Sequence, residues 1–225
     1  MIIEQLRNLT VKPNTFTGYF FVPDSTKIVN NLDKGGLFHL SFKSTDSKSY
    51  RTLFLKSEKD QSLKIGFVTI EDVNQKQDQI RTFFDEILLR NNFEIQPLRN
   101  EIQHFAEANK LIISSALLSC LSEQQEEDSD IALFDVLMGG LPPLVMIEDG
   151  RFHFPVRSGI PLGVNDLLIK SQILEVPINS VFYLHTQLNQ NYELRQLHSL
   201  LQDIDTQKLP DDILLFGLQL ASIEN

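Results

Sequence analysis

The chain has 225 residues, of which 42% are hydrophobic and 22% are charged, and its formal net charge is −10. This length and balance predict one globular domain over residues 1–225, with a hydrophobic core of its own. The acidic charge argues against a protein that binds nucleic acid through phosphate contacts, and equally against binding to an anionic membrane surface.

Cysteine content and the absence of a targeting pattern indicate the compartment. The single cysteine, Cys120, excludes an internal disulfide and lies in an apolar stretch, 111–121, which predicts a buried and inert thiol. The N-terminus lacks the basic flank and apolar core of a signal peptide. No apolar run approaches the roughly 20 residues of a membrane helix. We therefore expect a soluble, cytoplasmic protein.

The first third of the chain is typical of β-structure. Its segments are rich in Phe, Tyr, Val, Ile and Thr, and polar turn residues separate them. Strands are predicted at Thr15–Val22, Leu37–Ser44, Tyr50–Lys56 and Leu63–Ile70.

The hydrophobic period then changes to that of a helix. Between Asn74 and Asn92 apolar residues recur at the spacing of an amphipathic helix, with Ile80, Phe83, Phe84, Ile87 and Leu88 on one side. Further helices are predicted at Pro97–Leu121 and Tyr192–Asp203.

Strands return in the second half of the chain. They are predicted at Ile131–Leu137, Leu144–Ile147, Arg151–Val156, Val181–Leu184 and Ile213–Leu220, and Asp149-Gly150 is a hairpin turn between the second and third of these. The last strand is apolar on both faces, which indicates a central position in a sheet. Strands in runs and helices in runs predict an α+β fold, drawn as a two-layer antiparallel β-sandwich flanked by helices.

Four stretches carry a resemblance through their order and spacing. They are Gly35-Gly36-Leu37-Phe38-His39-Leu40, Glu71-Asp72-Val73-Asn74, Gly139-Gly140-Leu141-Pro142-Pro143 with its following Asp149-Gly150 and Pro161-Leu162-Gly163, and Asp211-Asp212-Ile213. In this order they resemble motifs of the metal-dependent protein phosphatases (PPM), in particular the SpoIIE/RsbU-like serine phosphatase branch. The resemblance covers roughly residues 25–221. It implies the αββα phosphatase fold, with the Gly-Gly-x-Pro-Pro turn as scaffold at a crossing between two core strands.

The metal chemistry of that family is largely missing. The resemblance implies two Mg²⁺ or Mn²⁺ ions held by aspartates, which activate an attacking water. Three of the corresponding positions are Leu37, Leu40 and Gln187, and only Asp72 and Asp211 remain as vestigial carboxylates. A helix N-cap and a strand-entry turn are the plainer interpretations of these two aspartates. The leading expectation is a pseudophosphatase with no catalytic residue and no metal cofactor.

Two alternatives stay open. One is an active, divergent serine/threonine phosphatase that uses Mn²⁺ or Mg²⁺ at Asp72 and Asp211, and the other is a sensor that binds a small ligand in the emptied cleft. His39 and His185 fall in degenerate motifs, and together they would suit Zn²⁺ or Mn²⁺. Hydrogen-bonded, half-buried strand histidines are the simpler interpretation.

A chain without this chemistry is expected to act by binding. The resemblance implies bacterial signalling of the partner-switching type in stress response, with a STAS-domain protein, a kinase-type signalling protein or a second copy of the chain as partner. The candidate contact residues around the former cleft are Leu37, His39, Leu40, His185 and Gln187. Arg81, on the first predicted helix, is the candidate for a dimer contact.

Overall fold

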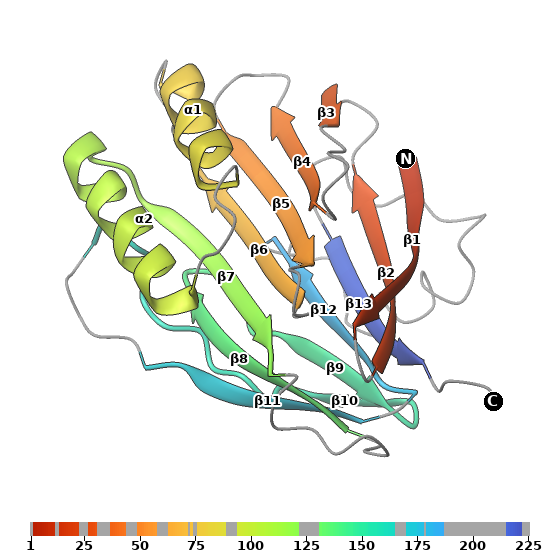
Figure 1. Ribbon diagram of the computed structural model, residues 1–225. Coiled ribbons are helices and arrows are strands. Elements are labelled where there is room, and N and C mark those ends of the chain that lie inside the picture. The colour runs from red at the N-terminus through yellow and green to blue at the C-terminus, as the bar shows by residue number, and fades with distance from the viewer. Residues whose placement is uncertain are drawn as a thin grey trace, which may run out of the picture.

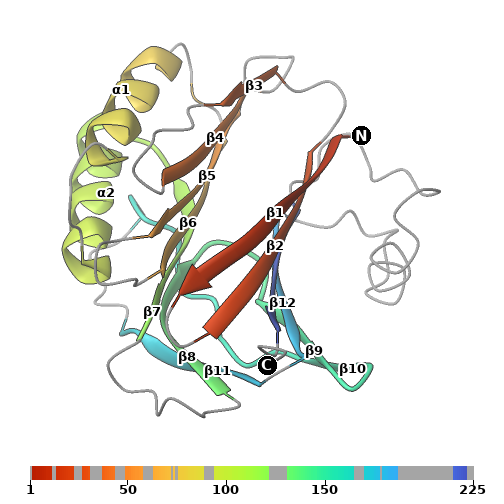
Figure 2. The same cartoon turned by 45° about the vertical axis from the view of Figure 1, so that its right-hand side comes forward.

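Two antiparallel sheets pack face to face, and two helices lie on the outer side of one of them (Figures 1 and 2). The structure is a computed structural model that describes residues 2–11, 14–22, 27–30, 37–43, 49–57, 63–71, 73, 76–88, 94–121, 131–164, 170–177, 179–186 and 215–221. This confirms the predicted α+β class and the two-layer sandwich.

The first sheet has six strands and brings distant parts of the chain together. Its order is β1-β2-β13-β12-β9-β10, and all neighbours are antiparallel. β13 lies between β2 and β12, which confirms the predicted central strand near the C-terminus. The strands are β1 (Ile2–Val11), β2 (Asn14–Val22), β13 (Leu215–Ala221), β12 (Val181–His185), β9 (Val145–Glu148) and β10 (Arg151–His153).

The second sheet has seven strands, again antiparallel throughout, in the order β11-β8-β7-β6-β5-β4-β3. The strands are β11 (Gln172–Pro177), β8 (Ile131–Gly139), β7 (Ile113–Cys120), β6 (Leu63–Ile70), β5 (Tyr50–Ser57), β4 (Leu37–Lys43) and β3 (Lys27–Asn30).

Alternate residues of both sheets form the core between them. Successive side chains of a strand point to opposite faces, so the strands whose side chains are described place alternate residues in the layer between the sheets. Phe134 of β8 and Phe182 of β12 meet edge to face across this layer, with ring centroids 5.6 Å apart. Other fully buried members of the core are Leu53, Phe67, Leu118, Leu184 and Phe216.

A second apolar layer lies between the seven-stranded sheet and the helices α1 (Gln77–Leu88) and α2 (Ile95–Asn109). The apolar stripe predicted for α1 is buried there at Ile80, Phe84 and Ile87. Phe83 of α1 stacks on Phe105 of α2 with ring centroids 3.9 Å apart, which joins the two helices. α2 packs on β7 and β8.

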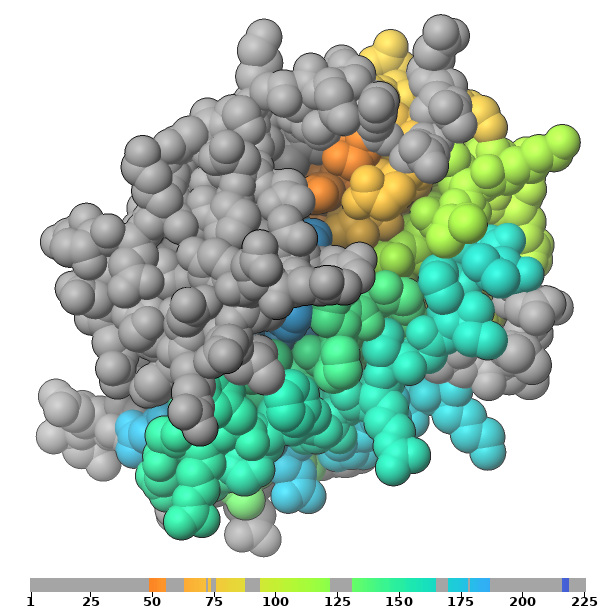
Figure 3. Space-filling view, turned by 180° about the vertical axis from the view of Figure 1, so that it is seen from behind, coloured from red at the N-terminus to blue at the C-terminus, as the bar shows by residue number. Residues whose placement is uncertain are grey.

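On the face seen from behind, most of the coloured surface belongs to residues 131–164, in green and teal (Figure 3).

The predicted helix Pro97–Leu121 is wrong in its C-terminal half. α2 ends at Asn109, where Lys110 adopts a left-handed conformation with φ 53°, and residues 113–120 form strand β7. The stretch that follows Lys110 is apolar on both faces, because this strand is covered by the opposite sheet on one side and by the helices on the other. A continuous apolar run has no hydrophobic period, so it cannot be used to distinguish a buried helix from a buried strand.

The other differences concern strands. The segment predicted at Arg151–Val156 is a strand only to His153, and Pro155, which has no backbone donor, stands just beyond its end. β1, β3 and β11 were not predicted. The helix predicted at Tyr192–Asp203 lies outside the described residues. Neither helix among the described residues is long and apolar enough to cross a membrane.

Candidate functional site

The turn Gly139-Gly140-Leu141-Pro142-Pro143 carries the chain from one sheet to the other. β8 ends at Gly139 in the seven-stranded sheet, and β9 begins at Val145 in the six-stranded sheet. Gly140 has φ 73°, and a Cβ atom at this position would lie 2.5 Å from Ser114 Oγ. Only glycine satisfies both conditions, because a side chain would be strained by φ and would collide with its neighbour. The expectation that this turn shapes a crossing between core strands is confirmed.

The Pro161-Leu162-Gly163 segment lies against the same crossing. The Gly140 amide donates to the Gly159 carbonyl at 3.0 Å, and Leu162 exchanges two backbone hydrogen bonds of 2.8 and 3.0 Å with Ile113 of β7. The Gly163 amide donates to Gln103 Oε1 of α2 at 3.0 Å. The Gly139-Gly140 turn and the Pro161-Leu162-Gly163 segment belong to one sequence motif and are separated by the β9–β10 hairpin. The structure brings them together at the end of β8.

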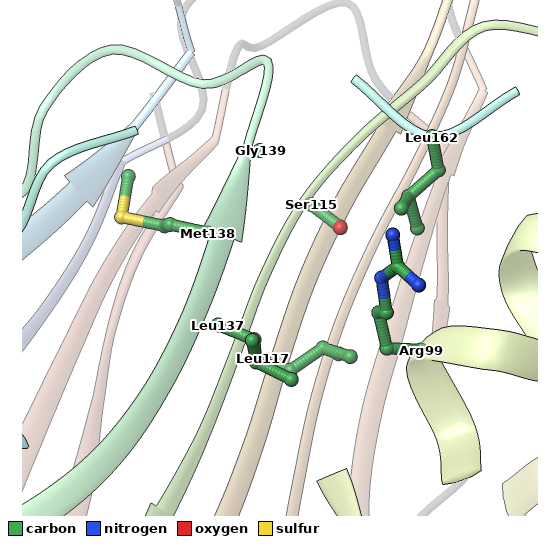
Figure 4. A pocket seen from close by; sticks show the side chains of 7 residues that line it. All are labelled: Arg99, Ser115, Leu117, Leu137, Met138, Gly139 and Leu162. Carbon is green, nitrogen blue, oxygen red and sulfur yellow. The ribbon is translucent and has the colours of Figure 1, made fainter. Parts of the chain in front are cut away.

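A small cavity opens beside the crossing, between α2 and the sheet. Its volume is about 10 Å³, which is about the space of one water molecule. Figure 4 shows Arg99 extending from α2 towards Leu162, with Ser115 on the facing strand. Its lining is Arg99, Ser115, Leu117, Leu137, Met138, Gly139 and Leu162. Pockets that enclose a small-molecule substrate are far larger, so this cavity is not one.

Arg99 places a positive charge inside this layer. Its side chain is 4% exposed, and its Nη1 donates to Asn100 Oδ1 at 3.1 Å. Sequence reasoning missed Arg99 and the equally buried Gln103, although both are polar residues that flank the apolar stripe of α2 at a four-residue spacing. That spacing was the available signal, because residues four apart share one face of a helix.

The sheet register places the candidate residues of β4. Leu40 is paired with Leu53, whose side chain lies in the core between the sheets. Leu37 and His39 are paired with Lys56 and Phe54, and Phe54 belongs to the helix-side layer. Positions 37 and 40 therefore lie on opposite faces of the sheet, as residues three apart on a strand must.

His185 ends β12 and is buried, with 5% of its surface exposed. Its Nδ1 donates to the Thr186 carbonyl at 2.7 Å, which leaves the lone pair on Nε2. Burial lowers the pKa of His185, and the hydrogen bond to Thr186 opposes this only in part. Because Leu184 points into the core, position 185 falls on the outward face of the six-stranded sheet. Position 39 is on the outward face of the other sheet, so the structure does not bring the two histidines together.

Arg81 lies on the solvent side of α1. Its Nε is 3.5 Å from Asp85 Oδ2, one helical turn away, and 51% of its side chain is exposed. An exposed pair of this kind contributes only a few tenths of a kcal/mol, about 0.3–0.5, so Arg81 has little role in stability.

The remaining candidates fall outside the described residues: Gln187, Asp72 and Asp211. Among the residues that the structure does describe, no three His, Cys, Asp or Glu side chains gather as they would around a metal ion. Cys120 is 3% exposed, and burial raises the pKa of its thiol to about 12. This confirms that the thiol is buried, as predicted.

Comparison with known proteins finds similar solved structures but no sequence relative. No protein-family model and no curated protein matches the sequence. The chain is similar to the crystal structure of RsbX in complex with magnesium, with 14% identity and a TM-score of 0.44 over 98% of this chain and 99% of that one. It is also similar to the RsbU and RsbW domains of Rv1364c from Mycobacterium tuberculosis, with 14% identity and a TM-score of 0.47 over 89% of this chain and 62% of that one.

Proposed function

We propose that this protein is a pseudophosphatase: a phosphatase-like fold that acts by binding other proteins in bacterial signalling of the partner-switching type. The support begins with four motif-like stretches in the order of the SpoIIE/RsbU-like branch. The two stacked antiparallel sheets, with the Gly-Gly-x-Pro-Pro turn at the crossing between them, agree with that resemblance.

The observation that carries the proposal is the chemistry of β4. Leucine occupies positions 37 and 40, where the resemblance expects aspartates, and position 40 is paired with a residue of the inter-sheet core. A hydrocarbon side chain offers no ligand to Mg²⁺ or Mn²⁺, which require oxygen donors. It also raises the desolvation cost of any ion held beside it. The leucines at positions 37 and 40 of the sequence are therefore what supports a pseudophosphatase over a metal-dependent enzyme.

The proposed partners are a STAS-domain protein, a kinase-type signalling protein or a second copy of the chain. We place the heterologous contact around Leu37, His39 and Leu40, and a dimer contact on the exposed side of α1 around Arg81. Leu37→Asp is expected to weaken partner capture, and Arg81→Glu to reduce the mass measured by light scattering. If both variants fold and neither binding nor mass changes, these two contact surfaces are wrong.

Activity is tested with a phosphoserine peptide and an aryl phosphate in the presence of Mn²⁺ or Mg²⁺. The expected result is no hydrolysis above background and no Mn²⁺ binding in calorimetry. Asp72→Ala tests the surviving motif aspartate, and Asp78→Ala, in the first turn of α1, is its matched control. Metal-stimulated turnover that is lost in Asp72→Ala and kept in Asp78→Ala would establish the alternative, an active Mn²⁺- or Mg²⁺-dependent phosphatase.

A further inference from the structure

Within the described part of the chain, the two helices cover only part of the outer face of the seven-stranded sheet. α2 packs on β7 and β8, with Ile113 at the start of β7 and Leu137 near the end of β8 in the layer beneath the helices, and Phe84 of α1 stacks on Tyr50 of β5. Neither described helix lies over the other ends of β7, β8 and β11 (Figures 1 and 2). We call this part of the sheet the open face, and its residues are Leu121, Ile131, Leu133, Asp135, Ile173 and Glu175.

The open face is apolar and accessible. Ile173 and Ile131 are 55% and 37% exposed, and Leu121 and Leu133 are half-buried. The Leu121 amide donates to the Leu133 carbonyl at 2.8 Å, so these two residues are neighbours, and Ile173 is paired with Asp135 on the next strand. Apolar side chains gathered on a sheet face, rather than scattered singly, mark a contact surface.

The charged groups of the open face are the carboxylates of Asp135 and Glu175, and the neutral Ser119 of β7 is the cross-strand partner of Asp135. Asp135 Oδ1 is buried and accepts no hydrogen bond within the described part of the chain, and Glu175 is exposed beside it on β11. Lys64, two strands away in the same row, is 7% exposed and has contacts of its own. A buried carboxylate oxygen without a donor is costly, and a donor from a bound partner removes that cost.

We infer that the open face binds a basic, amphipathic protein segment: apolar side chains pack on Ile131, Leu133 and Ile173, and a Lys or Arg reaches Asp135 and Glu175. Charge complementarity selects this occupant. A second copy would bring the same acidic groups, and the chain as a whole carries a net charge of −10. An acidic segment is disfavoured for the same reason.

The inference rests on the proposed function in one respect, since a binding module needs a contact surface, but the two fail separately. Metal-stimulated hydrolysis would overturn the proposed function and would leave the inference about the open face standing.

The probe for binding to the open face is a synthetic peptide of about 20 residues, long enough for several helical turns, with Leu on one face and Lys on the other. Its counterpart has Glu in place of every Lys. Binding is measured by calorimetry at two salt concentrations.

Matched variants locate the binding site. Ile173→Ser is expected to raise the Kd of the Lys peptide about tenfold, as loss of a central apolar contact does. Ile112→Ser, at a residue of similar exposure (58%) just before the other end of β7, is expected to change it less than about twofold. Glu175→Lys should weaken binding more than Glu86→Lys on α1, although both change the net charge equally. Circular dichroism and thermal melts confirm that the variants fold.

Three outcomes overturn the inference. The first is that the Lys peptide does not bind the wild-type protein, or that the Glu peptide binds equally well. The second is equal weakening by Ile173→Ser and Ile112→Ser. The third is a dimer in light scattering that Ile173→Ser dissociates, which would make a second copy the occupant of the open face.

Discussion

The ring of Phe54 lies over Gly66, its cross-strand partner on β6. A Cβ atom at position 66 would lie 1.9 Å from Phe54 Cζ, and the ring is fully buried beneath the helices. The ring has no room to move without disturbing the layer that holds α1 and α2. We expect Gly66→Ala to lower the free energy of unfolding by roughly 2–3 kcal/mol, within the range of overpacked cores, as measured by urea denaturation.

A double-mutant cycle tests whether the ring causes this loss. In a Phe54→Leu background the smaller side chain leaves space, so the cost of Gly66→Ala should fall by at least about 1 kcal/mol. Strict additivity of the two changes would show that the cost at position 66 has another origin.

His185 should make the protein sensitive to mild acid. Its pKa in the folded protein lies below the ordinary value of 6.5 because burial disfavours the imidazolium. Below pH 6.5 the unfolded chain binds a proton at His185 that the folded protein binds only at lower pH. The contribution of neutral His185 to the free energy of unfolding is therefore fully present above pH 6.5, and it is lost as the pH falls through the pKa of the folded protein. The measurement is the free energy of unfolding between pH 7.5 and pH 5.

The matched variants for this prediction are His185→Gln and His104→Gln. The side chain of His104 on α2 is 81% exposed, and its Nδ1 lies 3.9 Å from Glu107 Oε2. His185→Gln should reduce the loss in the free energy of unfolding as the pH falls from about 6.5 to 5. His104→Gln should leave that loss unchanged. Equal curves for wild-type and His185→Gln would contradict the prediction.

Lys110 ends α2 in a conformation that favours glycine. Its φ is 53°, and its backbone amide donates to the Ala106 and Glu107 carbonyls in the last turn of the helix. A side chain in the left-handed region costs about 1 kcal/mol, so Lys110→Gly should raise the free energy of unfolding by about 0.5–1 kcal/mol. Lys110→Ala is the control, since alanine keeps the Cβ atom and should give no gain.

Cys120 should be unreactive in the folded protein. Its thiol is buried, and a pKa of about 12 leaves almost no thiolate at pH 8. Alkylation by iodoacetamide, followed by mass spectrometry, should be at least about a hundredfold slower for native than for denatured protein. Rapid labelling of native protein would show that the β7–β8 layer opens locally. The stabilisation from the neutral thiol is present below pH 9.0 and is lost as the pH rises from 9.0 to about 12.

The sequence is sufficient to predict those parts of the fold whose physics is local. The Asp149-Gly150 turn adopts φ of 47° and 73°, and Leu63–Ile70 is a strand over the range expected from its composition. The stripe of α1 is visible because only one side of that helix is buried. β7 is buried on both sides, and its apolar run therefore carries no period that separates strand from helix.

The candidate site was harder to predict, because it depends on which strands become neighbours. His39 and His185 belong to similar degenerate motifs, yet the register places them on outward faces of two different sheets. The Asp135 and Ile173 pair of the open face depends on β11, a strand that was not predicted. Local pattern identifies segments, and pairing between distant strands decides which side chains meet.

The position of β13 has a consequence for how the chain folds. β13 lies between β2 and β12, and Phe216 is paired with Phe20 from the opposite end of the sequence. During synthesis, β2 and β12 are both made before the strand that joins them, so each presents an unpaired edge until β13 arrives. Contacts of such long sequence separation form slowly, and open strand edges invite association between chains. Deletion of β13 would therefore divide the six-stranded sheet in two. We expect a protein that lacks this strand to aggregate as it folds.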